Sequence, residues 1–243
     1  MNSKITQYLN LVEVEDEAVT RSILLTSDIH TTGLGSIDAD GCSIIIIAGD
    51  IMGAGMDSDD AGKAYVEREI YPFCEEHSDK QIIVTAGNHD KYLFRLWERG
   101  ESLRGPANMH YLIDRSATID GLKVYGTPWC TKDRPGRFEA SSHGLTDRFR
   151  SIPYGLDILI SHSPPFVPGE KVDVYDGYHD GSPELTEEIL KKRPRLCVCG
   201  HVHGGSREPI MLGSTKVMNV ARVKGDRSKE SHKPVSIRFT YER

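Results

Sequence analysis

Seven side chains in short polar blocks have the types and the spacing needed to bind metal ions. Asp28 and His30 are two residues apart, as are His201 and His203, so in an extended segment each pair points to one side. The whole set carries only nitrogen and oxygen donors and consists of Asp28, His30, Asp50, Asn88, His162, His201 and His203. Seven such donors are too many for one tetrahedral ion and predict a pair of divalent cations.

Asp50 is the candidate ligand shared by both ions, because two metals about 3.5–4 Å apart need a bridging carboxylate. Mixed imidazole and carboxylate donors favour Mn first, with Fe, Zn or Ni as further choices, over Ca or Mg. Such a pair lowers the pKa of a bound water to about 7, so hydroxide is available for hydrolysis at neutral pH. The leaving oxygen still needs a proton, which a nearby His can donate. Asp90, next to His89, can orient that imidazole or hold it protonated.

Each polar block follows a short apolar run, which predicts that strands deliver the blocks. Four β-branched residues at Ile44–Ile47 suit a strand covered on both faces, as in a parallel sheet under helices. Asp50 would then lie at the carboxyl edge of that sheet, where open α/β sheets bind ligands. The same pattern recurs at Ile23–Thr26, Ile82–Thr85, Ile158–Ile160 and Leu196–Cys199. Five runs with metal-ligand chemistry at the same end are hard to attribute to turn preference.

The segments between these runs carry helix signals. Asp60–His77 is loosely helical, and a second helix is expected after Asp90. Ser182 reads as the N-cap of a third helix, which ends before Pro194. Strands and helices in alternation predict a mainly parallel sheet. A charged segment, Lys224–Lys233, is expected to be an exposed hairpin connection. Three later runs predict short strands of a second, more antiparallel sheet: Met211–Leu212, Val217–Val220 and Val235–Tyr241.

Length and composition predict one globular domain. The 243 residues contain no Pro/Gly/Ser-rich linker, so the expectation is a single domain over 1–243, with 1–20 as an N-terminal arm or helix packed on it. A net charge of −6 argues against bulk attraction to nucleic acid or an anionic membrane. The sequence contains no run of about 18 apolar residues, so no membrane span is expected. Five cysteines without framework spacing, and no apolar signal core at the N-terminus, predict a reducing, cytoplasmic location.

Taken together, the blocks resemble the calcineurin-like metallophosphoesterase family. The matching motifs are Asp28-x-His30, Gly49-Asp50, Gly87-Asn88-His89-Asp90, His162 after a strand, and Gly200-His201-x-His203. The resemblance implies an α/β fold, a four-layer αββα sandwich with two mixed β-sheets flanked by helices. It implies His89 as the general acid beside the substrate. It also implies two ligand sets, one of Asp28, His30, Asp50 and His203, and the other of Asp50, Asn88, His162 and His201.

Two further stretches narrow the branch. Val124–Trp129 and Ser161–Pro165 resemble small, single-domain phosphodiesterases, with the metallophosphoesterase-domain brain proteins and their microbial relatives as the nearest branch. The predicted activity is hydrolysis of a nucleotide-like or other small phosphodiester, with a phosphomonoester as the other small substrate. Two alternatives stay open: a nuclease on DNA or RNA, which the acidic total weakens, and a non-catalytic metal-binding scaffold of the same fold, which would usually lack some ligands.

Several residues keep two interpretations. Trp129 can wall a substrate pocket or pack in the core. Cys197 and Cys199 face one side of an expected strand, where buried thiols usually act as small hydrophobes. Four arginines in an expected loop region can contact a phosphate or form a solvated basic face: Arg134, Arg137, Arg148 and Arg150.

Overall fold

All five apolar runs that precede a polar block form β-strands, as predicted. The computed structural model describes residues 18–30, 33–53, 56, 58–132, 134–224 and 231–242. The five strands are β1 (Ala18–Thr26), β2 (Ile44–Ala48), β3 (Gln81–Thr85), β7 (Ile158–Ser161) and β10 (Leu196–Cys199). The others are β4 (Met109–Tyr111), β5 (Arg115–Ile119), β6 (Leu122–Thr127), β8 (Val174–Tyr175), β9 (Tyr178–His179), β11 (Ile210–Leu212), β12 (Thr215–Asn219) and β13 (Val235–Glu242).

The three predicted helices are present. The first is a continuous run of α1 (Asp59–Tyr65), a π-helical segment η2 (Val66–Ile70) and α2 (Tyr71–Glu76). The second is α3 (Lys91–Glu98), and the third is α5 (Pro183–Lys192). Ser182 caps α5 as predicted, because its side chain accepts a hydrogen bond from the backbone N–H of Leu185 at 3.3 Å. A short 3-10 turn, η1 (Leu34–Ser36), precedes β2.

A fourth helix, α4 (Ser142–Arg150), was not predicted. The expectation of a loop at Arg148 and Arg150 is therefore wrong, because both lie in the last turn of this helix. Its buried residues are Leu145 and Phe149, a single i, i+4 pair, and this apolar stripe is too sparse to stand out in the sequence.

The five ligand-bearing strands divide between two mixed sheets. The first sheet has the order β13-β1-β2-β3-β4 and the second β11-β12-β10-β7-β6-β5. The first sheet is mainly parallel, as predicted, because β1 to β4 pair in parallel, but the expectation that the later strands form a separate, more antiparallel sheet is wrong. Strands β7 and β10 lie in the second sheet, where β12 is parallel to β10, and β13 returns to pair antiparallel with β1. An apolar run shows which faces of a strand are covered but not which strand lies beside it.

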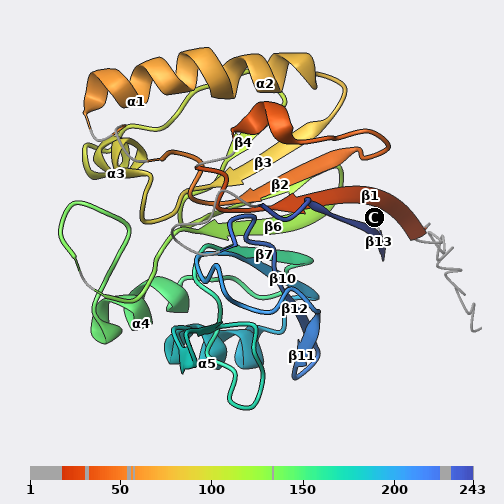
Figure 1. Cartoon of the computed structure of the whole chain (residues 1–243). Coiled ribbons are helices and arrows are strands. Elements are labelled where there is room, and N and C mark those ends of the chain that lie inside the picture. Colours follow the sequence, from red (N-terminus) through yellow and green to blue (C-terminus); the bar gives the residue numbers. More distant parts are fainter. Residues whose placement is uncertain are drawn as a thin grey trace, which may run out of the picture.

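The strand β2 is buried on both faces, but the two covering layers differ. Ile45 and Ile47 belong to the core cluster that contains the α1–α2 residues Tyr65 and Phe73. Ile44 and Ile46 belong to a second cluster, formed by strands of both sheets. Figure 1 shows α1 and α2 outside the first sheet and α5 outside the second. The fold is the predicted αββα sandwich. One face of β2 packs against the second sheet, whereas helices were expected on both of its faces.

Some expectations fall outside the described residues. The N-terminal arm lies there apart from residues 18–20, which begin β1. Most of the hairpin connection over Lys224–Lys233 lies there too, although Val223 and Ser231 at its ends form an antiparallel bridge. The single domain stays a prediction. Within the described ranges, no helix has the length and apolar character needed to cross a membrane.

Candidate metal centre

The ligand-bearing strands end at one edge, where the two sheets meet. Strands β1, β2 and β3 are parallel to one another, as are β7 and β10, so the carboxyl ends of each group lie together. A parallel bridge between Ser27 and Ala221 joins the segments that follow β1 and β12. This bridge places Asp28, from the first sheet, beside the His201–His203 turn of the second.

Three of the predicted ligands adopt a left-handed backbone conformation at their strand ends. The φ angles are 54° at Asp28, 52° at Asp50 and 66° at His201. For a residue with a Cβ this conformation costs on the order of 1–3 kcal/mol, and such strain clusters at functional sites. Each turn bends the chain immediately after its strand and directs the side chain across the edge of the sheet.

The first group of candidate ligands is Asp28, His30 and His203. One ligand atom of each lies within 4.8 Å of the others. Asp28 Oδ1 is 3.1 Å from His203 Nε2, and Asp28 Oδ2 accepts the backbone N–H of His201 at 3.0 Å. Burial disfavours a charge on Asp28, but the hydrogen bond with His203 and the charge of His162 outweigh it and lower its pKa. Asp28 therefore stays a carboxylate, the form that binds a cation.

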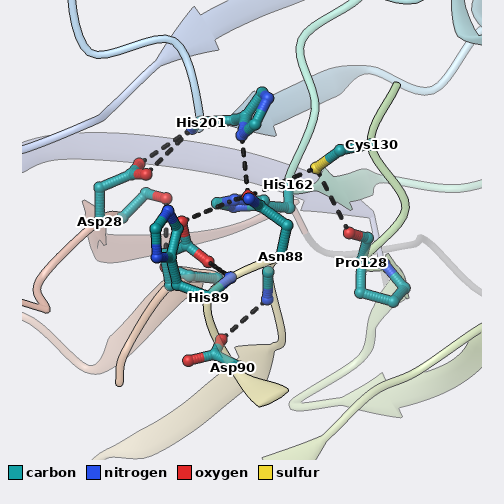
Figure 2. Close-up of polar contacts among 12 residues, drawn as sticks. Asp28, Asn88, His89, Asp90, Pro128, Cys130, His162 and His201 are labelled. Carbon is teal, nitrogen blue, oxygen red and sulfur yellow. Dashed lines mark hydrogen bonds and ion pairs between the residues drawn. The ribbon is translucent and has the colours of Figure 1, made fainter. Parts of the chain in front are cut away.

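The second group surrounds the amide oxygen of Asn88 (Figure 2). Asn88 Oδ1 is 3.2 Å from His162 Nε2 and 3.0 Å from His201 Nδ1. Asp50 Oδ2 is also 3.2 Å from His162 Nε2, and Asp28, Asp50 and His162 form a further compact group. Asp50 thus lies between the two groups, as a shared ligand would.

His162 shows that this second group requires a positive charge. Its Nδ1 lies 2.8 Å from the carbonyl oxygen of Ala48 and donates to it, so Nε2 of the neutral ring presents a lone pair. That lone pair faces oxygens of Asp50 and Asn88, and three acceptors cannot satisfy one another. Burial opposes ionisation of His162, but the charge of Asp50 outweighs it and raises the pKa to about 10. A bound cation would satisfy the same three atoms.

The remaining imidazoles suit metal binding as well. Within the described part of the chain, Nε2 of His30 and Nε2 of His201 are buried without a hydrogen-bond partner. Burial lowers the pKa of His30, and burial together with the charge of His162 lowers that of His201 to about 4. Both rings are therefore neutral at pH 7, the form in which imidazole binds a metal.

Glycines leave space for the ligands at three strand ends. A Cβ at Gly49 would lie 2.5 Å from His162 Nδ1, and one at Gly87 the same distance from His162 Nε2. A Cβ at Gly200 would lie 2.6 Å from Ser27 Cβ and closer still to Asp28 Oδ2. Real Cβ atoms essentially never approach other heavy atoms within 3.0 Å. The glycine in each block is therefore required by close packing around the ligands.

His89 lies in the pocket, whereas the structure gives Asp90 different partners from those predicted. The exposed His89 ring is 5.1 Å from the His30 ring, centre to centre, and its backbone N–H donates to Asp50 Oδ1 at 2.8 Å. The buried carboxylate of Asp90 accepts backbone N–H groups of Met52 at 2.7 Å and Gly87 at 2.8 Å. In the described structure no hydrogen bond joins it to the His89 ring. Asp90 instead connects the backbone of the Gly87–His89 loop with that of Met52.

Five of the seven candidate ligands line a pocket of about 370 Å³. The five are His30, Asp50, Asn88, His201 and His203, and the other lining residues include His89, Lys132, Arg134, Tyr175 and Asp180. Arg134 Nε donates to Glu139 Oε2 at 2.7 Å, and the Glu139 side chain is fully buried. A buried partner fixes the guanidinium at the mouth of the pocket, where it can contact an anionic substrate.

Three residues near this site were not identified from the sequence. Asn219, at the end of β12, is fully buried and donates to the carbonyl oxygens of Val172 and Val202, both at 2.9 Å. It therefore holds the turn between His201 and His203. Its signal was available, since Val217–Asn219 is another apolar run that ends on a polar residue. Lys132 and Cys130 follow β6 in an irregular segment that has no periodic pattern.

Trp129 belongs to the core, which decides between its two interpretations. It is 3% exposed, it packs edge-to-face against Trp97 and Phe138, and its Nε1 donates to Asp114 at 2.6 Å. The guanidinium of Arg148 lies 4.1 Å from the centre of its ring. All five cysteine thiols are free and buried.

Comparisons with known proteins show which family the chain resembles and which structures share its fold. The sequence profile described as calcineurin-like phosphoesterase matches residues 21–205. A UPF0046 protein of Caenorhabditis elegans is 36% identical over 101 residues, which cover 41% of this chain and 25% of that protein. Human metallophosphoesterase domain-containing protein 1 is 34% identical over 105 residues, 40% of this chain and 30% of that protein. The chain thus spans a minor part of the length of these relatives. A solved structure, TT1561 of Thermus thermophilus, shares the fold with a TM-score of 0.56 at 17% identity and covers 83% of this chain and 89% of its own.

Proposed function

The chain belongs to the calcineurin-like phosphoesterase family, a family of metal-dependent phosphoesterases, and we propose that it hydrolyses small phosphodiesters with two divalent cations. The observation that carries this proposal is that three acceptor atoms meet at His162. Its Nε2 lies 3.2 Å from Asp50 Oδ2 and 3.2 Å from Asn88 Oδ1, while its Nδ1 already donates to the carbonyl oxygen of Ala48. Such an arrangement is stable only around a positive charge.

We propose the ligand sets implied by the motif blocks. One cation is held by Asp28, His30, Asp50 and His203, and the other by Asp50, Asn88, His162 and His201. Bound there, two such ions lower the pKa of a water to about 7 and offset charge on the phosphoryl oxygens. The donor set favours Mn, with Fe, Zn or Ni as further choices.

The residues of the chain supply the remaining functions. His89 is the group that we propose to donate a proton to the leaving oxygen, because its ring is exposed in the pocket while its backbone is tied to Asp50. Asp90 positions the loop that carries His89, because its two hydrogen bonds to backbone N–H groups hold the Gly87–His89 loop and the Met52 segment together.

The pocket favours a small substrate over a nucleic-acid polymer. Its volume of about 370 Å³ suits a nucleotide-sized diester or monoester, and Tyr175 offers a ring for contact. The cations Lys132 and Arg134 stand beside the carboxylates Asp180 and Glu139, so the mouth is not a basic groove of the kind a nuclease needs. A complete ligand set argues against a non-catalytic scaffold. We also propose a cytoplasmic location, in keeping with five free thiols.

Turnover of bis-p-nitrophenyl phosphate with Mn²⁺ tests the proposal. The wild-type protein should hydrolyse the diester, and Asn88→Ala should abolish both turnover and binding of one ion. Asn108→Ala is a matched control, because it removes hydrogen bonds to the carbonyl oxygens of Cys74, His77 and Lys80. The control should lower stability but retain turnover at 25 °C. Failure of the wild type to hydrolyse any mono- or diester with several metals would refute the proposal.

A further inference from the structure

Cys130 lies at the second group of ligands, although no motif in the sequence connects it with them. Its side chain is 0% exposed and follows β6 after Pro128 and Trp129. Figure 2 shows its sulfur directed at Asn88, with Pro128 on the other side. The sulfur is 4.0 Å from Asn88 Oδ1 and 3.7 Å from the carbonyl oxygen of Pro128.

The distances around Cys130 match a shared metal position. One ligand atom each from Cys130, His162 and His201 lies within 4.8 Å of the others. Nitrogens of these two histidines are also 3.2 and 3.0 Å from Asn88 Oδ1. Asp50 belongs to this ligand set too, so Cys130 would be a fifth ligand; bonds of about 2.1 Å to oxygen and about 2.3 Å to sulfur, at angles of about 90–120°, place the two ligand atoms about 3.1–3.8 Å apart. The 4.0 Å between sulfur and oxygen is therefore close to that of two ligands on one ion.

The other cysteines make a useful contrast. Cys42, Cys74 and Cys197 are buried in the hydrophobic core cluster that faces the helices. Among the described residues, Cys130 is the one thiol that falls in a compact group with two histidines. Packing as a small hydrophobe accounts for the core thiols, but it does not account for a thiol that lies 4.0 Å from the amide oxygen of Asn88 and forms a compact group with His162 and His201.

We propose that the Cys130 thiolate is a ligand of the cation held by Asn88, His162 and His201, and that it makes this position selective for Zn²⁺ or Fe²⁺ over Mn²⁺. This inference rests on the proposed metal function and deepens it. As the sulfur–metal bond forms, the S–H bond breaks, its proton passes to solvent, and the sulfur donates an electron pair without any change of oxidation state. Thiolate favours softer ions, whereas the group of Asp28, His30 and His203 offers only nitrogen and oxygen. The two positions should therefore hold different metals.

Cobalt spectroscopy separates this inference from the proposed function. Bound Co²⁺ gives visible d–d bands with any ligands, and a thiolate ligand adds an intense near-ultraviolet charge-transfer band. The wild type should show both, and Cys130→Ser should keep the visible bands and lose the near-ultraviolet one. The matched control Cys74→Ser changes a thiol buried in α2 and should keep both. Zn²⁺ affinity of Cys130→Ser should fall by about 10-fold or more while Mn²⁺ affinity changes little.

X-ray absorption on the zinc-loaded wild type needs no variant. A sulfur scatterer at about 2.3 Å from zinc is expected. Bound Co²⁺ or Zn²⁺ without any sulfur signal would overturn the role of Cys130 and leave the metallophosphoesterase proposal standing. Failure to bind any ion would overturn both. A near-ultraviolet band that survives in Cys130→Ser would assign the sulfur to another cysteine and overturn the inference.

Discussion

Replacing Gly87 by alanine should disable the site through a single methyl group. The new Cβ would lie 2.5 Å from His162 Nε2, 2.7 Å from the backbone nitrogen of Asp50 and closer still to Asp50 Oδ1. Neither neighbour can retreat freely. Asp50 Oδ1 accepts the backbone N–H of His89 at 2.8 Å, and Nδ1 of His162 is held by the carbonyl oxygen of Ala48 at 2.8 Å.

The geometry sets the size of the expected effect. Ordinary contact begins at 3.4 Å, so the Asp50 backbone would have to move from 2.7 Å by about 0.7 Å. A displacement of about 1 Å in a catalytic group can cost about 100-fold in rate. We therefore expect kcat/KM to fall about 100-fold, with weaker metal binding. Overpacking of this kind also costs about 1–3 kcal/mol in the free energy of unfolding.

Three measurements check this prediction: diester hydrolysis with Mn²⁺, metal content, and urea denaturation. Gly35→Ala is the matched control, because a Cβ there would meet nothing within 4 Å and the residue has no left-handed φ. It should leave all three quantities unchanged. If Gly87→Ala keeps metal affinity and kcat/KM within threefold of the wild type, the close packing of Asp50 and His162 around Gly87 is not what organises the site.

Three further predictions follow from individual residues. His89→Ala should lower kcat by about 10²–10⁴-fold with metal content unchanged. The control His143→Ala changes an exposed histidine of α4 and should match the wild type. Loss of metal in His89→Ala would contradict a role as general acid alone. Because the pKa of metal-free His162 is raised to about 10, a proton competes with the cation for Nε2. Calorimetric metal affinity should therefore rise with pH, by up to about tenfold per unit below that pKa, and a flat profile would count against His162 as a ligand. Asn219→Leu leaves the buried carbonyl oxygens of Val172 and Val202 unpaired and should lower the free energy of unfolding, measured in urea, by about 2–4 kcal/mol. A loss under about 0.5 kcal/mol would contradict this role of Asn219.

Sequence patterns predicted the local parts of this molecule well. The Ile44–Ile47 run shows burial on both faces, because β-branched residues without polar alternation fit no exposed strand. The start of α5 was predictable because capping by Ser182 is a contact within four residues. The fold itself came from the resemblance of the motif blocks, which depends on their combination over 28–203.

The long-range parts were not predictable. Nothing in the strands β7 and β10 indicates that they pair with each other in a second sheet, since pairing depends on neighbours distant in sequence. The carboxylate of Asp90 was expected near His89, but loop geometry turns it toward backbone N–H groups. Cys130 has no spacing relation to His162 or His201, and only the packing of the two sheets brings these residues together.

Anomalous diffraction from crystals saturated with Zn²⁺, an ion that suits both positions, is the sharpest check on a two-cation centre around Asp50. Two anomalous peaks about 3.5–4 Å apart are expected, one on each side of the Asp50 carboxylate. Asp28 and His203 should contact one peak, and Asn88 and His162 the other. A single peak, or two peaks that do not share Asp50, would show that the chain does not form a two-cation centre around this carboxylate.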